Sequence, residues 1–242
     1  MKYKLKTILL KIIALFFPVT CSLCGDDLHS LSKTSICNKC KESLPLIKGL
    51  VCQKCGLPLC DGGEFCRECR KHSKEYNFDK MRSVYLYKDL ARRLILKFKY
   101  SNRSFLARDL GLAMNKTLRQ YNFYNDSDFV IPVPLNILRR IKRGYNQAEL
   151  LAEEISLITN IPLLKNVLFR KKITKPQFKL SKVERSKNIK DSFFVKNDVI
   201  IKNKTILLID DIATTSITVS SCSLALKTTG AKKVYVLTLA RD

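Results

Sequence analysis

The chain has 242 residues, of which 46% are hydrophobic, so it can build a sizeable core and wholesale disorder is excluded. Its formal net charge is +24, from 45 Lys and Arg against 21 Asp and Glu. Residues 73–242 contribute +18 (33 basic minus 15 acidic groups) and residues 1–72 contribute +6 (12 minus 6). Such a field favours polyanions, although a Lys-rich composition can also come from an AT-rich gene.

Residues 1–18 are expected to form an amphipathic helix. Its apolar run, residues 8–17, is interrupted by Lys11 and is shorter than the ~20 residues that span a bilayer. No small-residue cleavage site of a secretory signal follows it. We expect this helix to pack on the protein or to contact a membrane surface. The expected location is therefore cytoplasmic, and peripheral to the inner membrane in the second case.

Residues 19–72 are predicted to form a small cysteine module. Two residues between thiolates let one turn present both sulfurs to a tetrahedral ion, and two such turns complete a closed zinc site. Gly25 and Gly56 follow two of the pairs, where a tight knuckle needs a permissive residue. The spacing predicts a double zinc ribbon with two structural zinc sites, each held by four thiolates. Four Cys-x-x-Cys pairs supply them: Cys21/Cys24, Cys37/Cys40, Cys52/Cys55 and Cys66/Cys69.

Disulfides are the alternative for so many cysteines, and they would require an oxidising compartment. Cys60 stands outside the four pairs, as a substitute ligand or a free thiol. Cys222 lies in the predicted C-terminal helix, where a small core residue is expected.

Residues 80–242 are predicted to form an α/β domain. Alternation over 81–87 indicates a strand, and apolar spacing indicates helices over 89–100, 105–121 and 148–157. Between them, 128–134 reads as a buried strand that ends in prolines. A basic turn at 139–143 then reaches Gly144 before the next helix. A strand, a basic glycine turn and a helix N-terminus make an anion site, while the alternative is a helix start with a solvated basic flank.

Residues 165–190 carry ten basic groups against one acid, Glu184, and show little periodicity. Lys175-Pro176-Gln177 within them is typical of a mobile loop. Strands are expected again at 193–195, 205–209 and 233–239, with a helix over 219–228. This alternation predicts a mostly parallel sheet with helices on both faces.

The most informative segment follows the strand at 205–209. That strand ends in Asp210 and Asp211, and a hydroxyl-rich turn leads into the last helix. Ligands of open α/β sheets sit at such strand ends, where a helix N-terminus attracts phosphate. Ionised carboxylates accept hydrogen bonds from sugar hydroxyls or hold a metal. Together these groups favour a phosphorylated pentose, and the alternative is a buried strand that ends before an ordinary helix cap.

This segment resembles the signature of type I phosphoribosyltransferases. The order of motifs along the chain, from the cysteine knuckles through Pro132-Val-Pro134, Arg143-Gly144-Tyr145-Asn146-Gln147 and Thr174-x-x-Gln177 to the Asp-Asp turn, resembles the ComF family. That resemblance implies a zinc ribbon joined to a phosphoribosyltransferase-like domain, and an association with competence and the use of external DNA.

The resemblance also implies roles for individual residues. Asp210 and Asp211 would be catalytic and would hold the ribose hydroxyls of phosphoribosyl pyrophosphate, with Mg²⁺ as cofactor. The 5-phosphate would be held by Thr214, Thr215, Ser216 and Thr218, and the pyrophosphate would meet Arg143 and Gly144. A flexible loop would include Thr174, Gln177, Arg185 and Asn188. Ser216 departs from the family, which has Gly there, because a side chain hinders positive φ and close phosphate approach.

The sequence thus leaves two functions open. One is a phosphoribosyltransferase of unknown acceptor that binds phosphoribosyl pyrophosphate or a related pentose. The other is a non-catalytic accessory that uses the same fold to bind single-stranded DNA or the DNA-uptake machinery. The basic 165–190 segment favours the second, but only Phe169 and Phe178 supply stacking platforms within it.

Overall fold

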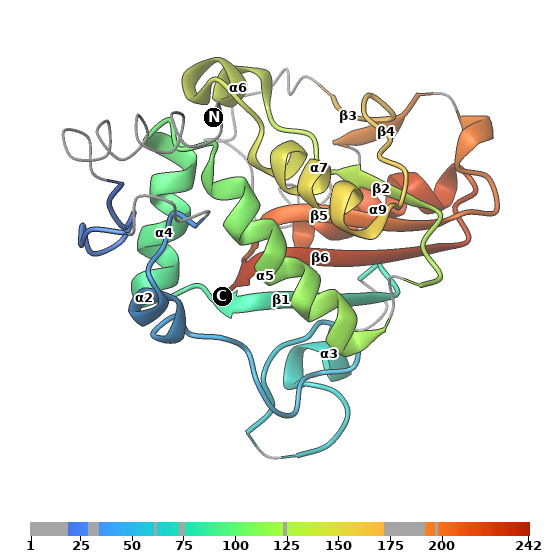
Figure 1. Ribbon diagram of the computed structural model, residues 1–242. Helices are drawn as coiled ribbons and strands as arrows, with labels where there is room; N and C mark the ends of the chain where they lie inside the picture. The colour runs from blue at the N-terminus through green and yellow to red at the C-terminus, as the bar shows by residue number, and fades with distance from the viewer. Residues whose placement is uncertain are drawn as a thin grey trace, which may run out of the picture.

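The centre of the molecule is a four-stranded parallel sheet (Figure 1). The structure, a computed structural model, describes residues 19–28, 34–60, 62–72, 76–122, 125–171, 192–196 and 198–242. The strands are ordered β1-β6-β5-β2, and each neighbouring pair is parallel. Their bounds are β1 Lys80–Leu86, β2 Phe129–Pro132, β5 Thr205–Ala213 and β6 Lys233–Arg241. The predicted parallel α/β sheet is confirmed.

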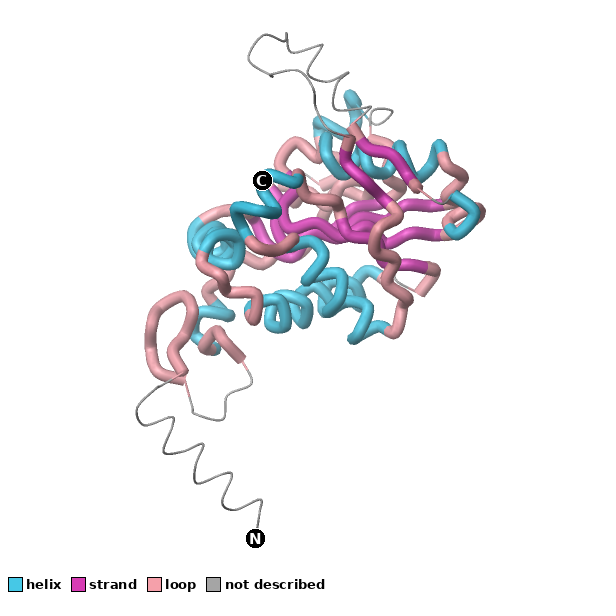
Figure 2. The backbone as a smooth tube through the Cα atoms, turned by 90° about the horizontal axis from the view of Figure 1, so that it is seen from above, coloured by secondary structure: helices cyan, strands magenta, loops and turns pink. Residues whose placement is uncertain are grey.

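Helices cover both faces of this sheet, as Figure 2 shows from above. Leu207 and Ile209 face one core, and Ile206 and Leu208 face the other, because alternate residues of a strand point to opposite faces. Long helices of the described part of the chain pack against these cores. They are α4 Asp89–Tyr100, α5 Leu106–Tyr121 and α7 Gln147–Thr159 on the first face and α9 Ile217–Thr228 on the second.

The predicted basic turn at 139–143 is wrong, because these residues belong to a short helix, α6 (Ile137–Arg143). Asn136 begins it by accepting a hydrogen bond from the Leu138 N–H at 3.0 Å. Gly144 ends it with φ 79°, a conformation that glycine adopts without strain. The Gly144 connection to α7 is as predicted.

Strand β5 is also longer than the predicted 205–209. Its pairing with β6 continues through Asp210 opposite Thr238 to Ala213 opposite Arg241. The Asp pair therefore belongs to the strand, and its backbone is held by the neighbouring strand. Helix α9 begins at Ile217, two residues before the predicted start.

A small antiparallel pair lies beside the main sheet. It consists of β3 (Leu168–Arg170) and β4 (Phe193–Val195), and a short 3-10 helix, η3 (Asp198–Ile200), follows. Phe169 and Phe194 stack across the pair with ring centroids 5.5 Å apart.

The cysteine module packs against both cores. Cys21 and Cys40 join the first, and the last four paired cysteines join the second. Residues 45–47 run along the edge strand β1, where the Ile47 N–H donates to the Val84 carbonyl at 2.9 Å. Short helices α2 (Asn38–Glu42) and α3 (Arg67–His72) carry the last cysteine of each group. The boundaries 19–72 and 80–242 stay a prediction, and the helix predicted over 1–18 lies outside the described residues.

None of the helices in the described part of the chain has the length and apolar character needed to cross a bilayer.

Candidate functional site

The site begins where β2 ends beside β5, four residues before the end of β5. Pro132 of β2 pairs with Ile209 of β5, so both strands present their carboxyl ends to one edge of the sheet. The chain continues from β2 to α7 on one face and from β5 to α9 on the other. Neighbouring strands whose connections leave on opposite faces open the crevice in which α/β proteins bind ligands.

Asp210 and Asp211 lie at this edge in two different environments. Asp211 Oδ2 is 3.0 Å from Lys99 Nζ of α4, and both side chains are only 13% exposed. Asp210 Oδ1 accepts a hydrogen bond from the Asp211 N–H at 2.8 Å. Burial, and after it the charge of Asp211, raises the pKa of Asp210 to about 8. The raised pKa of Asp210 and the Lys99 ammonium on Asp211 both reduce the negative charge of the pair.

The turn after the Asp pair presents hydroxyls to solvent around one buried serine. Thr214, Thr215 and Thr218 are exposed. Ser216 is 3% exposed and adopts φ 58°, the left-handed conformation that glycine would take freely. Its Oγ is buried and has no hydrogen-bond partner among the described residues. The start of α9 thus contains a buried hydroxyl whose hydrogen-bonding capacity is unused among the described residues.

Arg143 and Gly144 come to the same place through the last turn of α4. The Arg143 guanidinium donates to Gln147 Oε1 at 2.9 Å and to the Tyr100 hydroxyl at 3.0 Å. It also lies over the Tyr100 ring, 4.8 Å from the centroid. Tyr145 donates its hydroxyl proton to the Phe98 carbonyl. Because Tyr100 adjoins Lys99, one turn of helix connects the Gly144 turn to Asp211.

The structure therefore brings Asp211 and Arg143 to the same turn of α4, and the roles predicted for the ligand residues stay a prediction. The contacts there are made by Lys99 and Tyr100, which the sequence analysis did not single out. Lys99 is one of several basic residues on α4, and its partner Asp211 is far along the chain, so no local pattern singles it out. The predicted flexible-loop residues Thr174, Gln177, Arg185 and Asn188 lie outside the described residues.

The eight paired cysteines form two four-thiol clusters, as the spacing predicted. One holds Cys21, Cys24, Cys37 and Cys40, and the other Cys52, Cys55, Cys66 and Cys69, with the sulfurs of each within 4.8 Å of one another. The Cys24–Cys37 and Cys55–Cys66 sulfur distances are 3.7 and 3.6 Å. Tetrahedral zinc with Zn–S bonds of ~2.3 Å requires ~3.8 Å between sulfurs, whereas a disulfide requires ~2 Å.

All ten cysteines are free thiols, so the disulfide alternative is not adopted. Cys60 is exposed and belongs to neither cluster. Gly25 and Gly56 have φ +86° and +70°, as tight knuckles require. A Cβ on Gly56 would also lie 2.6 Å from the Met81 carbonyl oxygen. The clusters are two zinc-binding sites of the structural type.

Long basic side chains tie each cluster to the α/β domain. At the first cluster, Lys97 Nζ donates to the Ser22 carbonyl at 2.6 Å, and Arg103 donates to Ser22 Oγ at 3.0 Å. At the second, Arg82 donates to the Cys52 carbonyl at 3.3 Å, and Arg241 donates to the Cys55 carbonyl. These bonds fix the knuckles on which the thiols sit.

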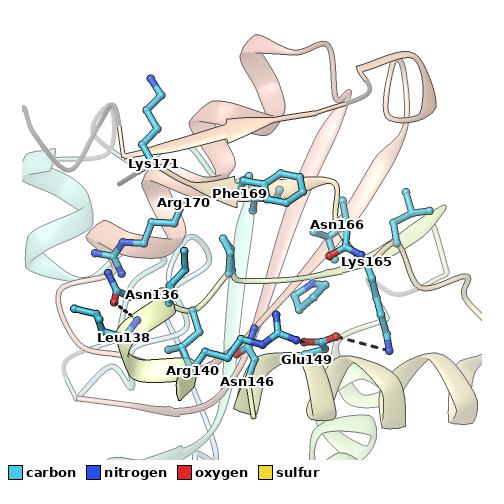
Figure 3. Close-up of a pocket in the computed structure, with 17 residues that line it drawn as sticks. Asn136, Leu138, Arg140, Asn146, Glu149, Lys165, Asn166, Phe169, Arg170 and Lys171 are labelled. Carbon is cyan, nitrogen blue, oxygen red and sulfur yellow. Dashed lines mark hydrogen bonds and ion pairs between the residues drawn. The ribbon is translucent and has the colours of Figure 1, made fainter. Parts of the chain in front are cut away.

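A cavity of about 680 Å³ lies between the end of β2, α6, the start of α7 and β3 (Figure 3). Its apolar walls include Ile131, Leu164 and Leu168. Arg140 and Lys165 reach Glu149 of α7 from opposite sides, each at 3.7 Å.

Comparisons with solved structures find partial likenesses. Glutamine phosphoribosylpyrophosphate amidotransferase from Bacillus subtilis has 17% identity and a TM-score of 0.41, over 59% of this chain and 30% of that one. The purine phosphoribosyltransferase from Pyrococcus horikoshii has 21% identity and a TM-score of 0.35, over 55% and 70%.

Sequence comparisons cover the chain more fully. A family model described as a double zinc ribbon domain matches residues 12–70. The DNA utilization protein YhgH of Escherichia coli K12 is 29% identical over 227 residues, 93% of this chain and 97% of that protein. Competence protein ComFC of Bacillus subtilis is 30% identical over 213 residues, 86% and 84%. Competence protein F of Haemophilus influenzae is 33% identical over 233 residues, which are 93% of this chain and 98% of that protein. With its two four-cysteine clusters and parallel α/β domain, the chain belongs to the ComF family.

Proposed function

We propose that the chain binds phosphoribosyl pyrophosphate with Mg²⁺ at the edge shared by β2 and β5. One observation carries this proposal. The Asp210–Asp211 pair and the Arg143–Gly144 turn both contact the last turn of α4, and the hydroxyl turn with the buried Ser216 follows the Asp pair directly along the chain. Diol acceptors, phosphate donors and a guanidinium are the three kinds of group that a pyrophosphorylated pentose requires.

Each group has a separate role in the proposed complex. Asp210 and Asp211 accept hydrogen bonds from the ribose hydroxyls. Thr214, Thr215 and Thr218, with Ser216, donate to the 5-phosphate at the N-terminus of α9. Arg143, held on Tyr100 and Gln147, faces the pyrophosphate. Transfer to an acceptor would depend mainly on positioning and on stabilising the departing anion.

The donor set fits Mg²⁺, because that ion takes one or two carboxylates together with substrate phosphates. The residues that would hold it are Asp210 and Asp211, and bound Mg²⁺ would supply neutralisation of the pyrophosphate charge. Lys99 supplies a positive charge to the same carboxylate pair. Ligand binding therefore has to shift the Lys99 ammonium away from Asp211 and release the Asp210 proton.

A thermal-shift experiment tests the proposal. Phosphoribosyl pyrophosphate with Mg²⁺, at about a hundred times its dissociation constant, adds ~2.7 kcal/mol to the free energy of unfolding. For a chain of this size the melting temperature should rise by about 5–10 °C. The Asp210→Asn/Asp211→Asn double variant should show no shift.

Asp198→Asn is the matched control, because Asp198 is exposed on η3. This substitution also replaces a carboxylate with an amide. It should keep the full shift. An unshifted wild-type protein, or a double variant that shifts as much as the Asp198 control, would contradict the proposal.

A second candidate function is the binding of single-stranded DNA in its uptake or use. Relatives of this chain are named as competence and DNA utilization proteins. A specific observation favours it: α6 exposes Ile137, Leu138 and Ile141 between four basic residues, and the Phe194 ring of β4 is 41% exposed. Apolar and aromatic side chains among cations suit unpaired bases and their phosphates. Affinity for an oligonucleotide should fall steeply as salt rises, and affinity indifferent to salt would count against it.

A further inference from the structure

The two four-thiol clusters differ in how easily solvent reaches their sulfurs. In the first cluster Cys24 is exposed and Cys37 is half-buried, and the other two ligands, Cys21 and Cys40, are buried. All four ligands of the second cluster are buried, and the most accessible of them, Cys66, is only 6% exposed. A thiolate is oxidised only where an oxidant can reach its sulfur. The first cluster is therefore open to oxidants from solvent, whereas the described residues shield the second.

The two accessible sulfurs of the first cluster also lie next to each other, one on each knuckle. Cys24 Sγ and Cys37 Sγ are 3.7 Å apart. In the second cluster, Cys55 Sγ and Cys66 Sγ are 3.6 Å apart, but both residues are buried. The clusters thus have almost the same sulfur separation across their knuckles and differ in access. The second cluster is therefore an internal reference for the reactivity of the first.

Bonds that do not involve the thiols hold the two knuckles of the first cluster together. The Ser22 N–H donates to the Ser35 carbonyl at 2.8 Å, which joins one knuckle directly to the other. Ser22 is also fixed by Lys97 and Arg103. The Ser35 N–H donates to Asp109 Oδ2 of α5 at 2.7 Å. Because both knuckles are anchored on the α/β domain, their sulfurs stay close to each other even when no metal joins them.

We propose that Cys24 and Cys37 are a reversible oxidation site for peroxides, and that the disulfide between them releases the zinc of the first cluster. The sulfurs start 3.7 Å apart and a disulfide needs ~2 Å, a gap that small side-chain rotations close. With two of its four thiolates consumed, the site no longer holds zinc. This proposal does not depend on the binding of phosphoribosyl pyrophosphate, and its test needs no such ligand.

The reaction balances with a peroxide as the oxidant. One thiolate attacks a peroxide oxygen, the O–O bond breaks, and the products are a sulfenic acid and hydroxide. The second thiolate attacks the sulfenic sulfur, the S–S bond forms, and a second hydroxide leaves. The two sulfurs together lose two electrons, which the two peroxide oxygens gain, and two protons from solvent convert the hydroxides to water. A dithiol reductant reverses the oxidation, after which zinc can bind again.

Zinc release from the zinc-loaded full chain tests the proposal. Hydrogen peroxide is added in the presence of a chromogenic chelator, with a peroxide-free sample beside it, and disulfides are located by peptide mass spectrometry after the free thiols have been blocked. One zinc per chain should leave together with formation of the Cys24–Cys37 disulfide, and the other should leave at least about tenfold more slowly. A dithiol reductant with added zinc should restore both metals.

Several results of this experiment would overturn the proposal. They are zinc release no faster than in the peroxide-free sample, equal release rates for the two metals, and earlier loss from the second cluster. A first disulfide that joins any other two cysteines would also overturn it, as would zinc loss that the reductant does not reverse.

Ligand substitutions assign the reaction to this pair. Cys24→His and Cys37→His each remove one reacting thiol and leave three thiolates with an imidazole, a set that also holds structural zinc. Each variant should contain two zinc and release the first at least about fivefold more slowly than wild type. A wild-type release rate in a variant that contains two zinc contradicts the assignment. If neither variant keeps the first zinc, the disulfide map of the wild-type protein decides.

Cys60→Ser is the matched control, because Cys60 is an exposed thiol that belongs to neither cluster. This variant should keep the wild-type rate of zinc release and the Cys24–Cys37 disulfide. Slower release in Cys60→Ser would show that the exposed Cys60 thiol is the one that reacts first with peroxide, and would overturn the proposed pair.

Discussion

Ser216 combines two unfavourable features whose removal should stabilise the protein. It holds φ 58°, and its buried Oγ has no partner among the described residues. The left-handed conformation costs a non-glycine residue about 1–2 kcal/mol, and a buried unsatisfied hydroxyl costs about 1–3 kcal/mol. Glycine removes both of these costs, but it lowers stability by about 1 kcal/mol because it increases the entropy of the unfolded chain. Ser216→Gly should therefore raise the free energy of unfolding by about 1–4 kcal/mol.

Thermal and urea unfolding of the zinc-loaded protein, without other ligands, measure this effect. The expected rise in melting temperature is about 2–4 °C for each kcal/mol. Ser216→Ala is the matched control, because it removes the hydroxyl and keeps the strained φ. Its stability should exceed that of wild type and lie at most about 1 kcal/mol below that of Ser216→Gly. A Ser216→Gly protein less stable than wild type would refute the reasoning.

The same pair of variants reports on phosphate binding. If strain is the obstacle, Ser216→Gly should also tighten phosphoribosyl pyrophosphate binding, by about 1 kcal/mol. If the hydroxyl belongs to the phosphate cradle, both variants should bind more weakly although they are more stable. Stability and affinity would then change in opposite directions, which is the usual sign of a residue kept for function.

Three further predictions concern other parts of the structure. The pKa of Asp210 is raised to about 8 in the folded protein, so its contribution to stability is complete below about pH 4 and is lost as the pH rises through about 8. The side chain of Asp210→Asn stays neutral, so the melting temperature of this variant should rise relative to that of wild type as the pH increases from about 5 to about 8.5. A difference in melting temperature that does not change with pH would contradict this. A Cβ on Gly111 of α5 would lie 2.5 Å from Glu154 Cβ of α7, so Gly111→Ala should cost about 1–3 kcal/mol in urea unfolding, and a neutral effect would show that the two helices separate freely. Elemental analysis should find about two zinc per chain, about one in Cys24→Ser and two in Cys60→Ser, whereas a zinc-free protein with disulfides would refute the metal assignment.

The sequence predicted the elements whose causes are local. The four Cys-x-x-Cys pairs assemble into their clusters because spacing alone sets the knuckle, and periodicity marked α4 over its observed length. The Asp pair could be assigned to a strand end because an apolar run precedes it. Its strand could not be given the right length, because residues 210–213 are held in β5 by pairing with β6.

The contacts that complete the site could not be predicted from local sequence patterns, because they join residues that are far apart along the chain. The charges of residues 139–143 suggest a turn. These residues nevertheless form a helix, which Asn136 caps at its start and Gly144 ends. Lys99 approaches Asp211 only because α4 and β5 pack in one core. Periodicity reports which face of a helix is buried, and it does not report which distant residue meets that face.

The last turn of α4 connects the first zinc cluster to the Asp pair, and this connection is itself testable. Lys97 holds the Ser22 carbonyl at 2.6 Å, and two residues later Lys99 holds Asp211 at 3.0 Å. Because both bonds belong to one helical turn, loss of the first should loosen the second. We expect Lys97→Met to speed amide hydrogen exchange at residues 98–101 and 211–216.

Lys41→Met is the control for that experiment. Lys41 pairs with Asp109 of α5 at 3.4 Å, so it ties the same cysteine module to a different helix. Exchange around Asp211 should stay at the wild-type rate in this variant. If Lys97→Met speeds hydrogen exchange near Ser22 alone, the first zinc cluster stabilises only the cysteine module. If exchange also rises around Asp211, the first zinc site contributes to the geometry of the Asp pair. That would give a physical reason for one chain to contain both the zinc module and the α/β domain.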